Sequence, residues 1–464
     1  MNGEKMKNKQ YFLVGIGGIG MQAVARLLAA NGHRVSGSDV GDFEARMDLK
    51  CAGIETFVGH DAAHITKNID EVIYSAAIPE TNPELQAARK LNIPVRRRLE
   101  PIGEIMKTKT GIAIAGTHGK TTATTMLALI LQAAGRDPLA LIGAEVKDAH
   151  SNVMLGHGSL MVVEACEYSR SFLDLNPKII VITNIEADHL DYYRDLDDIK
   201  DAFTDFLKKL PSDGIIIANG DDPTVREVVG RVNRKVVWAG LGEGNDLRAT
   251  NLEYREGRLH FAVNGTKLHL QVPGRHNVSD AVLAWGAARA VGVDDVTVKH
   301  VLQDEFKGIQ RRFEILGTTR GVTFVDDYAH HPTEITAVLE GTREYFGDRR
   351  LWVVFHPHQF SRTRLLLHDF AKSFVGVDTV LVAPIYAVRD SEADKKSISS
   401  EQLVDAINQI SNNAKYVGDF AKIEEWLEAK LQPGDVVLTM GAGQANLFGI
   451  KLLDRLRSQS QAVF

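Results

Sequence analysis

Residues 115–122 of the chain read AGTHGKTT. They close the apolar run GIAIA at 111–115 and open a helical pattern that extends to Ala134. A glycine loop between a strand and a helix is the setting of an ATP phosphate loop, in which backbone N–H groups cradle the phosphates. The loop is shorter than the common form, because Ile114 stands five positions before Gly119. The stretch predicts an α/β fold that binds ATP, although a structural glycine turn is the alternative. The expected ATP-binding residues are Gly116, Thr117, His118, Gly119, Lys120, Thr121 and Thr122.

Two further side chains follow apolar runs that are expected to lie beside this loop. Glu164 ends the run 160–163, and His189 follows the run 179–182. Ligands of open parallel sheets gather at the carboxyl ends of the strands, so both residues are expected near Lys120. Together with the Thr121 hydroxyl they predict a Mg²⁺ site, whereas the alternative is that they cap or ion-pair locally.

A second glycine motif lies near the beginning of the chain. Residues 15–20 read GIGGIG after the apolar run 11–14, and Asp39 follows about twenty residues on, which matches the dinucleotide-binding fingerprint. The glycines let the backbone approach a diphosphate at a helix N-terminus, and this serves any nucleotide diphosphate. The motif alone leaves NAD(P), a UDP-sugar and a purely structural turn open.

Length and composition limit the class of protein. The chain has 464 residues, too many for one core, and these predict two or three domains. A net charge of −6 gives no sign of a nucleic-acid partner. No apolar run reaches the roughly 18 residues of a membrane helix, so membrane insertion is not expected. Cys51 and Cys166 are too few for a disulfide framework, and a cytoplasmic protein is therefore predicted.

The pattern of strands and helices divides the chain into three sections. Residues 1–106 alternate short apolar runs with helical patterns and predict a parallel sheet. Residues 107–313 restart the pattern at the phosphate loop and change to short alternating strands between about 247 and 272, which predict a small antiparallel patch laid on the α/β sheet. Residues 314–464 hold the expected strands 323–325, 351–355, 380–383 and 435–440. The segment 306–310 is a hinge candidate.

Several stretches, in one order along almost the whole chain, resemble the Mur ligase family, and especially its L-alanine-adding branch. They are GIGGIGM at 15–21, GTHGKTT at 116–122, TNIEADH at 183–189, GRHN at 274–277, RRF at 311–313, DDYAHHPTE at 326–334 and PHQFSRT at 357–363. The resemblance implies an N-terminal Rossmann-like UDP-binding domain, a central phosphate-loop ATPase domain and a C-terminal Rossmann-like domain.

The resemblance also implies a reaction. L-alanine is joined to the carboxylate of UDP-N-acetylmuramate through an acyl phosphate, with ATP and Mg²⁺, in cytoplasmic peptidoglycan precursor synthesis, by a monomer or weak homodimer. Lys120 is expected to act on the transferring phosphate, and His189 or His330 is expected to accept the proton of the amine. Two alternatives are a ligase that recycles murein tripeptide onto the same sugar and an NAD-dependent dehydrogenase. A nucleotide-switched protein without chemistry is a third.

The family motifs carry further roles onto residues of this chain. The UDP-sugar is expected at Gly15, Gly17, Gly18, Ile19, Gly20, Asp39, Ser75 and Ala77. The ATP site is expected to include His276, Asn277, Arg312 and Asp327, and L-alanine is expected at Tyr328, His330, His358 and Arg362. The family commonly reads EADESD where residues 164–169 read EACEYS, and an arginine where Gln359 stands. Arg362 must therefore carry more of the contact with a carboxylate.

Overall fold

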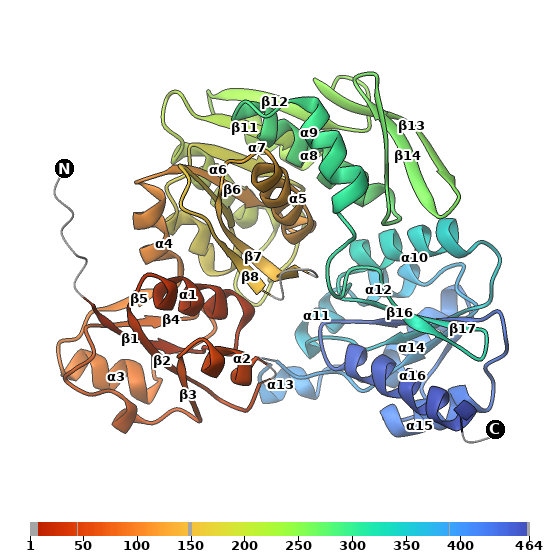
Figure 1. The fold of residues 1–464 in the computed structure, drawn as a ribbon. Helices are drawn as coiled ribbons and strands as arrows, with labels where there is room; N and C mark the ends of the chain where they lie inside the picture. The colour runs from red at the N-terminus through yellow and green to blue at the C-terminus, as the bar shows by residue number, and fades with distance from the viewer. Residues whose placement is uncertain (1–7, 44, 147–150, 389, 462–464) are drawn as a thin grey trace.

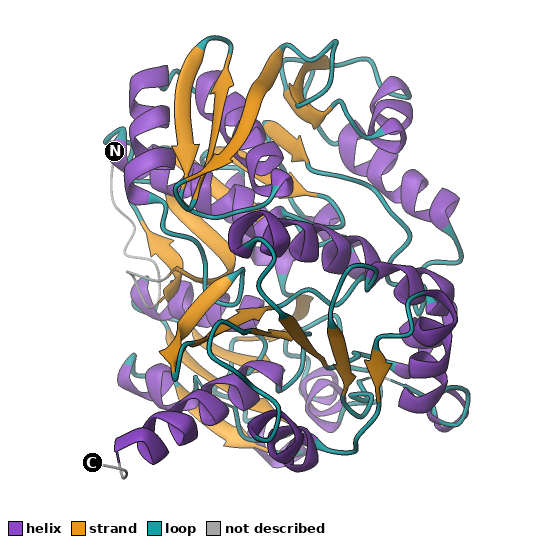
Figure 2. Ribbon diagram, turned by 90° about the vertical axis from the view of Figure 1, so that its right-hand side faces the viewer, coloured by secondary structure: helices purple, strands orange, loops and turns teal. Residues whose placement is uncertain are grey.

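Three separate sheets organise the protein. The computed structural model describes residues 8–43, 45–146, 151–388 and 390–461. In Figure 1 the N-terminal unit is at the lower left, the central unit is at the top and the C-terminal unit is at the lower right. Figure 2 shows helices packed against the strands of each unit, and this gives three α/β domains.

The N-terminal unit is a five-stranded parallel sheet in the order β3-β2-β1-β4-β5. The direction of winding reverses between β1 and β4, so the loops after these two strands open a crevice at the edge of the sheet. The predicted parallel sheet is confirmed, with β3 as an additional, half-buried edge strand. Its elements are β1 (Gln10–Val14), α1 (Ile19–Ala30), β2 (Arg34–Asp39), α2 (Arg46–Cys51), β3 (Glu55–Val58), η1 (Ala62–His64), β4 (Glu71–Tyr74), α3 (Pro83–Lys90), β5 (Val95–Arg97) and α4 (Leu99–Met106).

The central unit is a ten-stranded sheet in the order β15-β14-β13-β12-β11-β10-β6-β9-β7-β8. Strands β6, β9 and β10 are almost entirely buried, as their continuous apolar runs predict for parallel strands covered on both faces. The elements are β6 (Thr110–Ala115), α5 (Lys120–Ala133), β7 (Leu139–Val146), β8 (Ser151–Leu155), β9 (Leu160–Glu164), η2 (Tyr168–Asp174), β10 (Ile179–Ile182), α6 (Leu196–Lys208), β11 (Ile215–Asn219), α7 (Pro223–Gly230), β12 (Lys235–Gly240), β13 (Leu247–Arg255), β14 (Arg258–Val263), β15 (Thr266–Leu270), α8 (Arg275–Ala290), α9 (Asp295–His300) and η3 (Val301–Glu305).

The antiparallel patch is confirmed, but its predicted position on top of the sheet is wrong. Strands β13, β14 and β15 pair antiparallel with one another, and β13 pairs in parallel with β12 through Ala239 and Leu247. The patch therefore extends the edge of the central sheet. A hairpin of β7 and β8 closes the opposite edge.

The C-terminal unit has the strand order β16-β17-β21-β18-β19-β20, and β16 alone runs antiparallel to its neighbour. Strand β18 spans the predicted residues, and β17, β19 and β21 fall within three residues of the prediction. The elements are β16 (Glu314–Thr319), β17 (Val322–Asp327), α10 (Pro332–Phe346), β18 (Leu351–Phe355), α11 (Phe360–Leu365), α12 (Leu367–Ser373), β19 (Thr379–Val382), α13 (Glu392–Lys395), α14 (Ser400–Ile410), β20 (Ala414–Lys415), α15 (Phe420–Glu428), β21 (Val436–Met440) and α16 (Ala445–Gln461).

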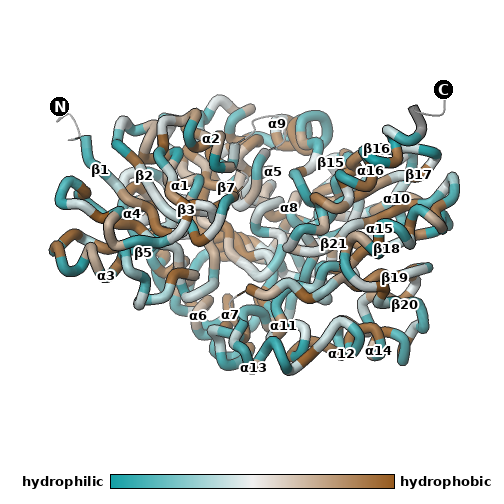
Figure 3. Tube along the Cα trace, turned by 90° about the horizontal axis from the view of Figure 1, so that it is seen from below, coloured by the Kyte–Doolittle hydropathy of each residue, from teal (hydrophilic) through white to brown (hydrophobic). Residues whose placement is uncertain are grey.

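The C-terminal unit meets the central unit at the loop between β6 and α5, where His118 lies 3.1 Å from Glu334. The N-terminal unit meets the central unit elsewhere, through contacts such as that of Asn152 with the carbonyl of Ile19. Strand β1 and helix α16 lie on opposite sides of the molecule, with the central unit between them in the chain (Figures 1 and 3). Seen from below in Figure 3, hydrophilic segments dominate the outer loops. None of the described helices has the length and apolar character that crossing a bilayer requires.

Candidate active site

The phosphate loop joins β6 to α5 and is held open by two glycines. Gly116 has φ +145° and Gly119 has φ +79°, and Gly119 is the N-cap residue of α5. The Lys120 ammonium donates to the carbonyls of Gly116 (2.5 Å) and Thr117 (2.9 Å) and forms an ion pair with Glu167 at 2.9 Å. Burial lowers the pKa of Lys120, but Glu167 more than offsets this, and the raised pKa keeps the side chain cationic. Lys120 can therefore meet a phosphate as a cation.

The segment after β10 stabilises the phosphate loop through hydrogen bonds. Thr183 donates through its hydroxyl to the carbonyl of His118 (2.5 Å), and the side-chain oxygen of Asn184 accepts the His118 backbone N–H (2.8 Å). The backbone N–H of Glu186 donates to the Thr117 hydroxyl at 2.9 Å. The TNIEADH motif therefore fixes the shape of the phosphate loop besides supplying His189.

A cavity of about 400 Å³ lies between the phosphate loop, α8 and α10. It extends from the loop to the boundary with the C-terminal unit, and its size and mixed polar and apolar walls suit a nucleotide. Of the predicted ATP-binding residues, Gly116, Thr117 and Lys120 lie in the adjoining loop, and the others line the cavity. Those lining residues are His118, Gly119, Thr121, Thr122, His276, Asn277, Arg312 and Asp327.

Two side chains that line this cavity, His276 and Asp327, have shifted pKa values. Burial, together with the Arg312 guanidinium, lowers the pKa of His276 to about 4, so the ring is neutral at neutral pH. Burial raises the pKa of Asp327 to about 6, although its oxygens accept the N–H groups of Phe313 and Ala329 at 2.7 Å each. The cavity therefore offers hydrogen-bonding and charged side chains within one enclosed space.

A second cavity, of about 330 Å³, lies between the crevice of β1 and β4 and the central unit, where Gly143, Glu164 and His189 line it. It is lined by Gly18, Ile19, Gly20, Ser75 and Ala77, all of which the sequence predicts for the UDP-sugar. The structure does not place the other three predicted residues, Gly15, Gly17 and Asp39, in the lining of this cavity. The carboxylate of Asp39 accepts the N–H groups of Gly17 and Val40 at 2.8 Å each, so it holds the glycine turn in place.

Arg98 is a cation in this second cavity that the sequence analysis missed. Its guanidinium lies so close to Gly20 that a Cβ on this glycine would overlap it. Arg98 follows β5 directly and lines the cavity together with Ser75 and Ala77. A guanidinium here faces the N-terminus of α1, where a diphosphate is best stabilised. The available signal in the sequence was the run Arg96-Arg97-Arg98, which begins in β5 and ends directly after it.

Glu164 and His189 line the second cavity, whereas Thr121 lines the first, so the predicted metal ligands are divided between the two cavities. The carboxylate of Glu164 accepts the N–H of Gly143 at 2.8 Å. His189 lies 3.6 Å from Glu167, and its Nδ1 is buried without a hydrogen-bond partner. The hydroxyl and carboxylate oxygens suit the hard Mg²⁺ ion, and the unpartnered Nδ1 leaves the ring available as a ligand, so the residues present fit the predicted metal.

The four residues predicted to receive L-alanine lie together in the C-terminal unit. The ring centroids of Tyr328 and His330 are 5.2 Å apart, and those of His330 and His358 are 5.9 Å apart. The Arg362 guanidinium lies 3.2 Å from the Nδ1 of His358. Burial, with a contribution from Arg362, lowers the pKa of His330 to about 4, and this ring is therefore neutral at neutral pH.

Three contacts tie the C-terminal unit to the central unit. Arg362 donates to the carboxylate of Asp188 at 2.8 and 3.2 Å. Glu334 lies 3.1 Å from the Nδ1 of His118 in the phosphate loop. The Thr333 hydroxyl donates to Glu186 at 2.6 Å. The C-terminal unit thus sits directly against the phosphate loop.

Several residues of the site were not predicted from sequence as functional. Glu167 pairs with Lys120, Glu334 with His118 and Asp188 with Arg362. Asp280 on α8 faces Gly119 inside the first cavity, and burial raises its pKa well above the ordinary value. Glu167 and Asp188 stand inside or beside motifs that the sequence analysis quoted, so a carboxylate next to a predicted ligand was the available signal.

Models of three Mur ligase domains match the chain in order. The model "Mur ligase family, catalytic domain" matches residues 10–110, "Mur ligase middle domain" matches residues 114–288, and "Mur ligase, glutamate ligase domain" matches residues 311–443. This order follows the three sheets. It argues against an NAD-dependent dehydrogenase, the alternative that the first glycine motif left open.

Curated relatives and solved structures agree with these models. UDP-N-acetylmuramate–L-alanine ligases from Alkaliphilus metalliredigens and Clostridium novyi are 41% and 42% identical, each covering 97% of this chain and 98% of its own length. The crystal structure of UDP-N-acetylmuramate-alanine ligase from Thermotoga maritima has a TM-score of 0.82 at 28% identity and covers 97% of this chain and 99% of its own. A murein peptide ligase from Psychrobacter arcticus has a TM-score of 0.73 at 25% identity, covering 97% and 98%. On this agreement of domain order, sequence and fold, the chain belongs to the Mur ligase family.

Proposed function

We propose that the chain catalyses the ATP-dependent ligation of L-alanine to the carboxylate of UDP-N-acetylmuramate in peptidoglycan precursor synthesis. The observation that carries the proposal is the position of the phosphate loop. Its residues line a nucleotide-sized cavity, and the third unit lies against it. Its Lys120 pairs with Glu167, whose neighbours Cys166 and Tyr168 line the second cavity at the glycine turn of the N-terminal unit. Relatives that are named for this reaction match the chain over nearly its whole length.

ATP belongs in the first cavity and the UDP-sugar in the second. His276, Asn277, Arg312 and Asp327 hold the nucleoside end of ATP, and residues 116–122 hold its phosphates. The diphosphate of the UDP-sugar lies at the N-terminus of α1, where the backbone of Gly18, Ile19 and Gly20 and the Arg98 guanidinium meet it. Lys120 pairs with Glu167, which stands between two residues of the second cavity, so the muramate carboxylate and the γ-phosphate approach each other beside Lys120.

The first step activates the carboxylate. A carboxylate does not react with an amine at neutral pH, because oxide is a very poor leaving group. The muramate carboxylate attacks the γ-phosphorus in line, the bond to the β–γ bridging oxygen breaks, and ADP leaves behind an acyl phosphate. Lys120 neutralises charge on the transferring phosphoryl group, which is the main catalytic need of such a step. Mg²⁺, when held by Thr121, Glu164 and His189, supplies further neutralisation of the phosphate oxygens.

The second step forms the amide. The alanine amine attacks the acyl carbon, and phosphate leaves from the tetrahedral intermediate. Arg362 binds the alanine carboxylate, and Tyr328, His330 and His358 form the wall of the pocket. His330 is neutral at neutral pH and can accept the proton of the amine. His189 is the second candidate for this role, and its unpartnered Nδ1 can serve either as this base or as a ligand of Mg²⁺, but not as both at once.

The division of the chain into three domains suits these two steps. We place the domain boundaries at 1–106, 107–313 and 314–464, because the three sheets segregate this way. The contacts of the C-terminal unit with the phosphate loop exclude water from the acyl phosphate, and residues 306–310 act as the hinge that releases them. The monomeric or weakly dimeric state and the cytoplasmic location stay predictions.

Product analysis tests the proposal. The purified protein is incubated with ATP, Mg²⁺, UDP-N-acetylmuramate and an equimolar mixture of L-alanine, glycine, L-serine and murein tripeptide, and the UDP-sugars are identified by mass spectrometry. We expect UDP-N-acetylmuramoyl-L-alanine as the main product and no product without ATP. A tripeptide adduct as the main product would assign the chain to the recycling branch, and no adduct at all would overturn the proposal.

A further inference from the structure

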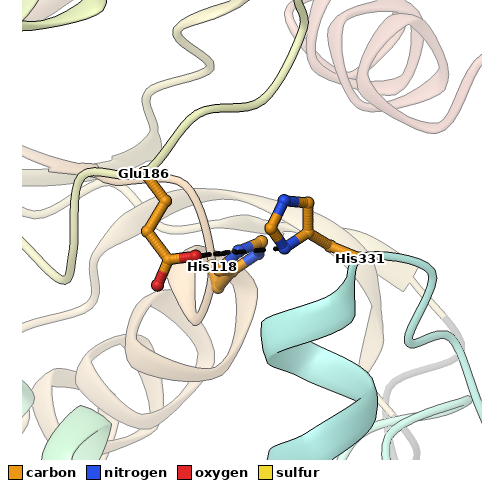
Figure 4. Close-up of side chains that lie close together, drawn as sticks. All are labelled: His118, Glu186 and His331. Atoms are coloured by element: carbon orange, nitrogen blue, oxygen red, sulfur yellow. Dashed lines mark ion pairs between the residues drawn. The ribbon is translucent and has the colours of Figure 1, made fainter. Parts of the chain in front are cut away.

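Two histidines and a glutamate meet where the central and C-terminal units touch (Figure 4). His118 belongs to the phosphate loop, Glu186 follows β10, and His331 is the N-cap residue of α10. One ligand atom from each lies within 4.8 Å of the other two. The Oε2 of Glu186 is 3.6 Å from the Nε2 of His118 and 3.9 Å from the Nδ1 of His331. These distances are too long for hydrogen bonds, so the three side chains surround a common point without bonding one another.

The outer side of each group is already fixed by a hydrogen bond. The Nδ1 of His118 lies 3.1 Å from the Oε1 of Glu334, so the Nε2 faces the cluster; this Nε2 is buried and has no hydrogen-bond partner. On the other ring, the Nε2 of His331 lies 3.3 Å from the carbonyl of Ala187, which can only accept, so Nε2 carries the proton. The lone pair of His331 is therefore on Nδ1, toward the cluster, where only a long 3.4 Å contact from the Thr333 N–H competes for it.

The glutamate is held in the same way. Its Oε2 accepts a hydrogen bond from the Thr333 hydroxyl at 2.6 Å. Histidines that bind a metal characteristically donate their other ring N–H to a carboxylate or a backbone carbonyl, and carboxylate ligands are themselves hydrogen-bonded. All three members of the cluster have such a partner. This is the arrangement of a built metal site, and a chance meeting of side chains does not require it.

We propose that His118, Glu186 and His331 form a site for a transition-metal dication such as Zn²⁺, separate from the Mg²⁺ site of ATP turnover. Two imidazoles and one carboxylate favour such an ion over Mg²⁺, which prefers oxygen ligands. Zn–N bonds of about 2.0–2.1 Å place tetrahedral ligand atoms about 3.4 Å apart, close to the observed 3.6 and 3.9 Å of the two pairs that include Glu186. The two ring nitrogens lie within 4.8 Å of each other, so the rings approach each other when the ion binds. The fourth position is left for water.

A bound ion would replace a proton. Burial lowers the pKa of His118, but Glu334 and Glu186 outweigh it and raise the pKa to about 9, so without metal the ring is held as a cation. The dication takes over this role and releases the proton, as metal binding to histidine does in general. Its ligands come from both units, so the ion ties α10 to the phosphate loop, stabilises the protein and slows nucleotide exchange at the first cavity, which His118 and Glu186 line.

Cobalt is the probe for this site, because tetrahedral Co²⁺ absorbs visible light far more strongly than octahedral Co²⁺. The metal-free full-length protein is titrated with Co²⁺ at mildly alkaline pH in excess Mg²⁺, which occupies the site proposed for turnover. We expect an intense visible band that saturates at one equivalent and is displaced by Zn²⁺, together with a higher melting temperature. No substrate is needed, so the outcome is independent of the proposed ligase activity.

Variants decide whether the band comes from this cluster. His331→Asn removes the imidazole and keeps a side-chain oxygen that caps α10, and it should weaken Co²⁺ binding at least tenfold. Glu186→Gln, which retains an oxygen for Thr333, gives a second test if His331→Asn folds poorly. The control is His269→Asn, because His260 and His269 form another histidine pair, with ring centroids 5.2 Å apart, on β14 and β15. Absence of the band, an unchanged band in both site variants, or its loss in His269→Asn would overturn the proposal.

Discussion

Arg362 of the C-terminal unit and Asp188 of the central unit form a buried ion pair. The guanidinium donates to one carboxylate oxygen at 2.8 and 3.2 Å. Burial raises the pKa of Asp188, but Arg362, with His189, outweighs this effect and holds it well below its usual range. The residue that should bind the alanine carboxylate is therefore oriented by a carboxylate next to His189. This links the acceptor pocket to the phosphate-transfer site.

Replacement of Arg362 by lysine tests this link. Lysine keeps the charge but loses the planar fork, and a hydrogen bond to a charged group is worth about 1.5–3 kcal/mol. We expect the KM for L-alanine to rise about tenfold or more, with the KM for ATP almost unchanged. Arg364→Lys, on the same helix and half-exposed, is the matched control. Equal increases in both KM values would show that Arg362 only holds the units together.

Arg98→Ala tests the cation that the structure places in the second cavity. Without this guanidinium the diphosphate loses a charge-assisted hydrogen bond, so the KM for UDP-N-acetylmuramate should rise about 10–100-fold. The KM values for ATP and L-alanine should stay within about twofold. Arg89→Ala removes an exposed arginine of the same unit that pairs with Glu80, and it should change nothing. An unchanged KM for the UDP-sugar in Arg98→Ala would contradict the assignment of this cavity.

Gly119→Ala separates backbone strain from collision in the phosphate loop. Gly119 has φ +79°, and a Cβ there would overlap the carboxylate of Asp280. We expect ATP affinity to fall at least tenfold and the free energy of unfolding to fall by about 1–3 kcal/mol. Gly135→Ala, near the other end of α5, has φ +67° and open space around its Cβ. It should lose stability but keep its ATP affinity, and equal ATP affinity in both variants would contradict the proposed loop geometry.

His118 should make stability fall in alkaline solution. Its folded-state pKa of about 9 lies above the ordinary 6.5, so the folded state binds the proton more tightly. The resulting stabilisation is fully present below about pH 6.5 and is lost as the pH rises through about 9, by at most about 3 kcal/mol. Urea unfolding in the presence of a chelator measures this. His118→Gln should lose the slope between these pH values, and the same slope in both proteins would refute the assignment.

The parts of the fold that sequence predicted are those with strong local patterns. Strands β6, β9 and β18 are continuous apolar runs because they are covered on both faces, and such runs stand out in the sequence. Strand β16 was missed because it is half-buried and interrupted by Gly317 at φ +149°, where its register shifts. The antiparallel patch was recognised, but its pairing with β12 depends on contacts between segments that no local pattern records.

The functional site, too, could be predicted only where a local motif marks it. The loops that carry Lys120 and Gly18 were predicted because each is a compact motif after a strand, and the role of His330 was predicted because its segment resembles a family motif. The partners of these residues were not predicted, because they come from distant segments: Asp188 and Arg362 are 174 positions apart, and His118 and Glu334 are 216 apart. Arg98 was missed because a run of arginines is also typical of a solvated surface. Which carboxylate pairs with which cation is decided only when the units pack.

Phosphate release tests the central claim most directly. The purified protein is supplied with ATP and Mg²⁺, and inorganic phosphate is measured with UDP-N-acetylmuramate alone, with L-alanine alone and with both. Release should require both substrates. It should fall at least about 10²–10³-fold in Lys120→Ala and stay normal in the control Lys178→Ala, which removes an exposed lysine at the far end of β10. Phosphate release that does not depend on UDP-N-acetylmuramate and L-alanine together, or that survives in Lys120→Ala, would contradict the account.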